Sequence, residues 1–234
     1  MSIIDIENRT ENWKTVEAFT PMLSNEEARC RLAQKLLQNI HENLNCSTKE
    51  VKLELFWNGV RDYLHWKDEQ GNSTSKKEKR EDRHSTPLAK TYQELFASLR
   101  SDIDKSKSLT LRKEWNYQAF DEKSVKKLFH NLHGTEMDIV LDTPGYLLVG
   151  EAKDESRLGA NSDLVLVHQL IRQYVTAKVL LHFSGNANKK VALFSVVKNR
   201  ESFLRTYQAK FVLDKGWLCT ANVLSWEDIN RLAK

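Results

Sequence analysis

The sequence predicts an α/β fold, because two strand-like runs joined by a turn precede a long helical pattern and a further strand-like run. The first two runs are Met137–Leu141 and Tyr146–Lys153, and Asp142-Thr143-Pro144-Gly145 separates them with Pro and Gly in the middle of a turn. Together they predict a β-hairpin. The third run, Lys190–Val197, is apolar along most of its length, which is typical of a strand buried on both faces.

The segment between the hairpin and the third strand has a helical period. Asn161 or Ser162 can serve as the N-cap of this helix, which we expect to continue to His182-Phe183. Apolar residues recur in it at three- and four-residue spacing, as on the buried side of a helix. They are Leu164, Val167, Leu170, Ile171, Tyr174, Val175, Val179 and Leu180.

The C-terminal part predicts one more strand and one more helix. A polar break at 184–188 precedes the strand at Lys190–Val197, and Asn222–Trp226 predicts a last short strand. Ser225 and Asp228 have the spacing of a capping box, in which the acid takes the N3 position. The sequence therefore predicts a terminal helix that begins next to Ser225.

The N-terminal third has a helical character. Ser24-Asn25-Glu26-Glu27 has capping-box spacing and predicts a helix to about Asn43. A second capping box, Ser47-Thr48-Lys49-Glu50, predicts another helix over the aromatic-rich segment that ends at Trp66. Residues 67–85 are polar and rich in charges of both signs, so we expect a linker there.

Three charged residues at the ends of the hairpin strands predict a metal site. The turn brings the second strand back beside the first, so Asp138 and Glu151 are expected to lie close together near the open end. Two carboxylates supply the hard oxygen ligands that Mg²⁺ prefers. Glu151 and Lys153 are two positions apart and so share one face of the strand. The alternative is an exposed hairpin with an ordinary Glu–Lys pair, but the apolar run Leu147–Val149 favours a buried strand end with a function.

These residues resemble a known family. Gly134–Val140 and Val149–Lys153 are similar to the signature of the PD-(D/E)XK nuclease superfamily, in the Glu-x-Lys form of archaeal Holliday-junction resolvases and several restriction and defence nucleases. The resemblance extends from about Thr86 to the C-terminus. It implies a nuclease core over 86–234 with a restriction-endonuclease-like mixed central sheet flanked by helices, ordered helix, three strands, helix and two further strands. Residues 1–85 would then form a helical extension and a polar linker.

The resemblance also suggests further site residues. Many members carry a glutamate on the helix before the strands, and Glu94, Glu114 and Glu122 remain open as candidates. Gln169 resembles the glutamine of the Gln-x-x-x-Tyr motif in the RecB-like branch. Gln173 stands where that motif has its tyrosine, so only Gln169 is carried over as a catalytic-site residue.

The implied activity is Mg²⁺-dependent endonucleolytic hydrolysis of DNA, in which Mn²⁺ can substitute. Asp138 and Glu151 would bind the metal, and Lys153 would stabilise charge on the phosphate. The implied role is restriction or anti-phage defence, with a DNA repair or recombination nuclease of the same fold and a non-catalytic nucleic-acid-binding module as alternatives. The N-terminal helices could hold a homodimer or a partner subunit. Target sequence, strand preference and oligomeric state stay open.

Composition is compatible with these expectations. The 234-residue chain has a net charge of +4 and a pI of about 8.8, a mild basicity that suits a nucleic-acid partner. Its three cysteines form no C-x-x-C pair, so neither a disulfide framework nor a structural zinc site is expected. No apolar run is long enough to span a bilayer and no signal peptide is recognisable, which predicts a cytoplasmic protein without a membrane partner.

Overall fold

The computed structural model describes residues 10–44, 47–62, 132–154, 158 and 168–234. The chain forms two compact units. The first comprises residues 1–57, 137–158 and 189–234, and the second comprises 58–136 and 159–188. The predicted linker at 67–85 and the candidates Glu94, Glu114 and Glu122 lie outside the described residues.

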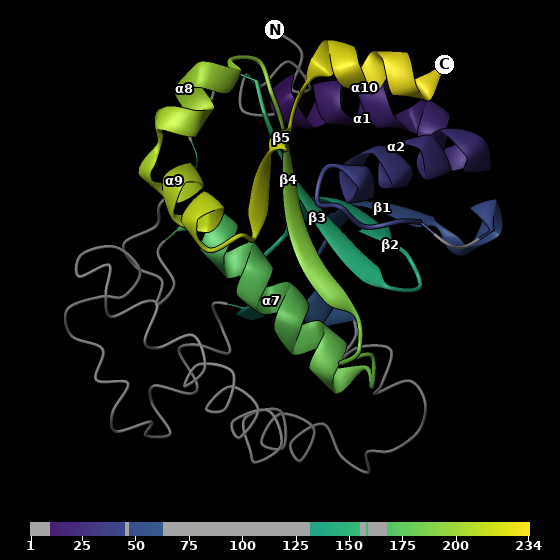
Figure 1. The fold of residues 1–234 in the computed structure, drawn as a ribbon, viewed down its shortest axis with the longest axis vertical. Helices are drawn as coiled ribbons and strands as arrows, with labels where there is room; N and C mark the ends of the chain where they lie inside the picture. Colours follow the sequence, from purple (N-terminus) through teal and green to yellow (C-terminus); the bar gives the residue numbers. More distant parts are fainter. Residues whose placement is uncertain (1–9, 45–46, 63–131, 155–157, 159–167) are drawn as a thin grey trace, which may run out of the picture. The chain divides into compact units, whose positions relative to one another are not determined.

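A five-stranded mixed sheet organises the first unit (Figure 1). Its strands lie side by side in chain order. The β1–β2 and β2–β3 pairs are antiparallel, and the β3–β4 and β4–β5 pairs are parallel. The strands are β1 (Lys52–Trp57), β2 (Met137–Asp142), β3 (Tyr146–Lys153), β4 (Lys190–Val197) and β5 (Leu218–Ser225). The predicted α/β class is confirmed, and the sheet is mixed and flanked by helices.

The β2–β3 hairpin forms where the sequence predicts it. Thr143 closes the turn: its backbone N–H donates to the Tyr146 carbonyl at 2.9 Å, and its hydroxyl accepts from the Tyr146 N–H at 3.0 Å. Pro144 and Gly145 are left as the two exposed residues of the loop. This turn fixes the register that brings the two strand ends together at the open end of the hairpin.

The predicted helix after residue 50 is wrong over 52–57, which form a strand; residues 59–62 are helical, and 63–66 lie outside the described residues. The capping box itself forms, with the Ser47 N–H donating to Glu50 Oε2 at 2.7 Å, but it starts only the short 3₁₀ turn Thr48–Glu50. The chain then enters β1, where Leu53 and Leu55 pack against the core and Lys52 and Glu54 alternate with them. Pairing with β2 and burial of one face outweigh the local helix signal.

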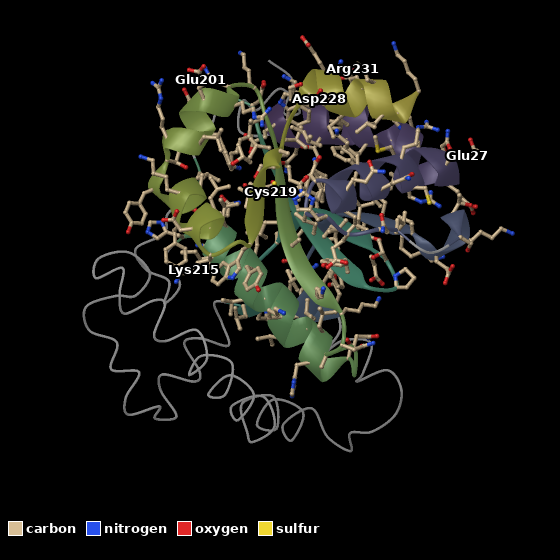
Figure 2. All side chains as sticks on the ribbon, in the orientation of Figure 1. Glu27, Glu201, Lys215, Cys219, Asp228 and Arg231 are labelled. Carbon is tan, nitrogen blue, oxygen red and sulfur yellow. The ribbon has the colours of Figure 1, made fainter. Side chains whose placement is uncertain are left out.

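Helices α1 (Thr10–Ser24), α2 (Glu26–Gln38), α8 (Arg200–Arg205), α9 (Tyr207–Asp214) and α10 (Trp226–Ala233) complete the first unit. The α2 helix is capped by Asn25 rather than Ser24, because Asn25 Oδ1 accepts the Ala28 N–H at 3.0 Å, and it ends before Asn43. The capping box of α10 is confirmed: Ser225 Oγ accepts from the Asp228 N–H at 3.1 Å. Figure 2 shows Asp228 and Arg231 on this helix.

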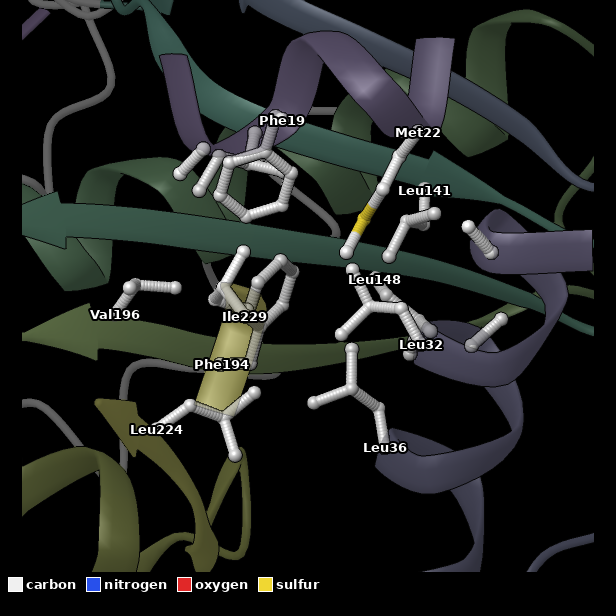
Figure 3. Close-up of a cluster of buried hydrophobic side chains, with 14 of the residues drawn as sticks. Phe19, Met22, Leu32, Leu36, Leu141, Leu148, Phe194, Val196, Leu224 and Ile229 are labelled. Carbon is white, nitrogen blue, oxygen red and sulfur yellow. The ribbon is translucent and has the colours of Figure 1, made fainter. Parts of the chain in front are cut away.

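One face of the sheet carries the hydrophobic core of this unit (Figure 3). Side chains from β2, β3, β4 and β5 meet side chains from α1, α2 and α10 there. The largest of them are almost completely buried, among them Phe19, Met22, Leu32, Leu36, Leu141, Leu148 and Phe194. Residues 10–38 are therefore built into the same unit as the sheet.

A close contact between β3 and β4 depends on a glycine. A Cβ atom added to Gly150 would stand 2.3 Å from Cζ of Phe194, whose ring fills the space above the strand. Phe194 is 1% exposed, so its ring is held by the core. Glycine at position 150 leaves room for the Phe194 ring to lie over the β3 backbone, just before Glu151, while the two strands stay paired.

The second unit is described mainly through α7 (Gln169–Phe183). The helix ends where the sequence predicts, but it begins at Gln169 with His168 as N-cap, later than the predicted start near Ser162. Within this unit, the Gln173 side-chain amide donates to the Glu136 carbonyl at 3.4 Å. In the ranges described above, no helix has the length and apolar character needed to cross a membrane.

Candidate active site

Asp138 lies on the face of the sheet opposite the core. Its neighbour Ile139 belongs to the core cluster, so strand alternation directs Asp138 to the other side. The pairing of Ile139 with Gly150 places Asp138 beside Glu151 one step nearer the open end of the hairpin. The Ala152 N–H donates to Asp138 Oδ2 at 3.0 Å and fixes the carboxylate there.

Glu151 and Lys153 share that face, as their spacing predicts. Lys153 Nζ lies 2.7 Å from Glu151 Oε1. The Glu151 side chain is completely buried and that of Lys153 is 12% exposed, so water screens this ion pair weakly. The structure thus brings three predicted residues, Asp138, Glu151 and Lys153, to one end of the β2–β3 hairpin.

A second glutamate, Glu11, reaches the same lysine from the first turn of α1. Lys153 Nζ donates to Glu11 Oε1 at 2.7 Å, and the Asp154 N–H donates to Glu11 Oε2 at 3.1 Å. Lys14, one turn further along α1, pairs with Asp154 at 2.5 Å. The sequence holds no local signal for these contacts, because the partners are more than a hundred residues apart.

Burial and charge shift the ionisation of the site. Burial of Asp138, together with the negative charge of Glu151, raises its pKa well above the ordinary value. For Lys153, burial favours the neutral amine, but the charges of Glu151 and Asp138 and the hydrogen bonds to the glutamates more than offset this and raise its pKa. Lys153 therefore remains a cation at neutral pH, while Asp138 is an acid that holds its proton more tightly than an exposed aspartate.

The donor chemistry fits a hard divalent cation. The negative charge of Glu151 raises the pKa of Asp138, so positive charge is favoured between the two carboxylates. Mg²⁺ commonly takes one or two carboxylates, with waters completing its octahedron. Asp138 and Glu151 would hold the metal. Within the described part of the chain, no group of three or more His, Cys, Asp or Glu side chains is arranged to bind one.

The remaining predicted site residues are not tested by this geometry. Gln169 is the first residue of α7 and belongs to the second unit, so its role beside the acids stays a prediction. Glu94, Glu114 and Glu122 lie outside the described residues. Glu11, from a helix that the sequence analysis did not predict, lies beside Lys153.

No protein-family model, curated protein or solved structure matches the chain in the three comparisons with known proteins.

Proposed function

We propose that the protein is a metal-dependent deoxyribonuclease that hydrolyses DNA phosphodiester bonds at the open end of the β2–β3 hairpin. Asp138 and Glu151 would be its metal ligands, and Mg²⁺ its natural ion with Mn²⁺ as a substitute. The observation that carries the proposal is the convergence of Asp138, Glu151 and Lys153 on one face of the sheet, with the carboxylate charges acting on one another. The sequence resemblance to PD-(D/E)XK nucleases is consistent with this site.

Each side chain has a distinct task in such a reaction. A divalent ion at the two acids supplies Lewis-acid chemistry and lowers the pKa of water. Lys153, cationic and largely shielded from water, would neutralise negative charge that develops on the phosphate in the transition state. Glu11 would orient the lysine through the 2.7 Å contact and so keep the ammonium group at the strand end.

Cleavage of supercoiled plasmid in Mg²⁺, Mn²⁺ or EDTA tests the proposal, with linear and single-stranded DNA as further substrates. We expect Asp138→Ala and Lys153→Ala to lose about 10²-fold or more in rate, since each removes transition-state stabilisation. Circular dichroism would verify that the variants are folded. Parental rates in both variants would rule out this active site.

Asp142→Ala provides a matched control. Asp142 is on the same strand and the same face as Asp138, but it lies at the turn end of the hairpin and pairs with Lys189 at 2.6 Å. We expect the Asp142→Ala variant to cleave DNA at the parental rate. Equal losses in Asp142→Ala and Asp138→Ala would indicate a general effect on the hairpin instead of loss of a catalytic group.

A second candidate function is a nucleic-acid-binding module without catalysis. It is favoured by the ion pairs of Lys153 with Glu151 and Glu11, which compensate the buried acids without any metal. Calorimetric titration separates the two functions. Binding of Mn²⁺ that is lost in Asp138→Ala supports the nuclease, whereas DNA binding with no metal binding supports the module.

For the nuclease, we propose a role in restriction or anti-phage defence, with DNA repair or recombination as the alternative. Defined fragments from plasmid digestion would indicate sequence-specific restriction. Cleavage that prefers branched or single-stranded DNA would indicate repair or recombination.

A further inference from the structure

Ser195 lies next to Glu151 on the neighbouring strand. The parallel register of β3 and β4 pairs Glu151 with Ser195, and paired residues of adjacent strands point to the same face. The residues on either side of it, Phe194 and Val196, point into the core on the other face (Figure 3). Strand alternation therefore directs the Ser195 hydroxyl to the face that carries Asp138, Glu151 and Lys153.

The surroundings of this hydroxyl are unusual for a buried polar group. Ser195 is 0% exposed, and among the described residues its Oγ has no hydrogen-bond partner. Leaving a buried hydroxyl without a partner destabilises the folded state. A serine at such a position, beside a fully buried carboxylate, favours a partner other than the protein groups of the described residues. A water molecule suits the site, because buried waters bind where several polar groups converge.

We propose that Ser195 is a positioning residue of this site, whose hydroxyl fixes the Glu151 carboxylate for metal binding through a bridging water molecule. The inference rests on the proposed metal site at Asp138 and Glu151. Groups that hold a ligand carboxylate in place set its orientation before the cation arrives, and their loss typically weakens metal affinity or activity by about 10–100-fold. Alanine cannot hold the water, whereas threonine keeps the hydroxyl on the same carbon.

Titration calorimetry with Mn²⁺, followed by plasmid cleavage, tests this role in the full chain. We expect Ser195→Ala to weaken Mn²⁺ binding about 10-fold and to slow cleavage by a similar factor. We expect Ser195→Thr to stay within about threefold of the parent in both. Ser202→Ala is the matched control, because Ser202 is an exposed serine on α8, and it should match the parent.

The outcomes separate this inference from the proposed function. Parental Mn²⁺ affinity in Ser195→Ala overturns the role of Ser195, whether or not DNA is cut. Loss of affinity in Ser195→Ala with recovery in Ser195→Thr supports that role, even if the parent leaves DNA intact and the nuclease proposal fails. Absence of Mn²⁺ binding by the parent overturns both. Thermal denaturation checks that Ser195→Ala is still folded at the temperature of both assays, so that weaker Mn²⁺ binding is not a consequence of unfolding.

Discussion

The ammonium nitrogen of Lys153 lies 2.7 Å from Oε1 of Glu11, although 142 positions separate the two residues. The contact joins the first turn of α1 to the end of β3. It makes an N-terminal helix part of the candidate site, where the sequence predicts only an extension beyond the core. The orientation of Lys153 thus depends on how α1 packs on the sheet.

Glu11→Gln should slow DNA cleavage by about 10-fold, equivalent to roughly 1.4 kcal/mol of transition-state stabilisation. The amide keeps an oxygen that can accept a hydrogen bond but removes the charge that holds the Lys153 ammonium. Single-turnover cleavage measures the effect. Glu17→Gln, an exposed acid further along α1, is the control, and an equal loss in both variants would contradict a specific role for Glu11.

Asp138→Asn should make the metal-free protein more stable at neutral pH. The raised pKa means that folded Asp138 binds a proton at pH values where the unfolded chain has lost it, so the free energy of unfolding falls as pH rises through that window. Asparagine does not ionise, yet its oxygen can still accept the Ala152 N–H. Urea denaturation of both proteins between about pH 3 and pH 8 would measure the difference, since this range covers the ordinary carboxyl pKa and a raised one.

The difference between Asp138→Asn and the parent should vanish at acid pH, where Asp138 is protonated in both the folded and the unfolded chain. Addition of Mg²⁺ or Mn²⁺ should raise the melting temperature of the parent and leave that of the variant nearly unchanged. An Asp138→Asn protein that is less stable than the parent at neutral pH would show that the carboxylate serves the fold.

Gly150→Ala should destabilise the protein by about 1–3 kcal/mol, the usual effect of overpacking a core. The new methyl would stand 2.3 Å from Phe194 Cζ, and the buried ring has little room to move. Phe194→Leu in the same chain should recover part of the loss. Gly145→Ala is the control. No atom lies within 4 Å of a Cβ at that position, so the free energy of unfolding should change by no more than about 0.5 kcal/mol. Equal stability of the two alanine variants would contradict the close contact.

Ser225→Ala should lower the free energy of unfolding by about 1 kcal/mol, because α10 loses its N-cap. The hydroxyl accepts the Asp228 N–H at 3.1 Å and donates to Asp228 Oδ2 at 2.8 Å. Thermal denaturation should show a melting temperature lower by roughly 2–4 °C. Cleavage well below that temperature should be unaffected. Ser202→Ala tests whether any serine gives the same shift, and a shift of equal size would argue against the cap.

The parts of the fold that the sequence predicts are those governed by local chemistry. The β2–β3 hairpin, the strand at Lys190–Val197 and the capping box at Ser225 each depend on residues a few positions apart. The shared face of Glu151 and Lys153 follows from the same local rule, the two-residue period of a strand.

The parts that the sequence missed depend on distant partners. Lys52-Leu53-Glu54-Leu55 alternates in the manner of a half-buried strand, but the preceding capping box favoured a helix, and only pairing with β2 decides between them. No local feature of the sequence marks Glu11, since its contacts arise from the docking of α1 against β3. Contacts between residues so far apart in the sequence can be identified only from the tertiary structure.

The contact of Lys14 with two distant elements has a consequence for biosynthesis. Its ammonium pairs with Asp154 at the end of β3 and lies 5.1 Å from the centre of the Trp226 ring, the first residue of α10. Because α10 follows every strand of the sheet, a nascent chain on the ribosome cannot complete the contacts of α1, the helix that carries Glu11, until translation has passed Trp226. The native packing of α1 is therefore completed only when nearly all of this chain has been synthesised.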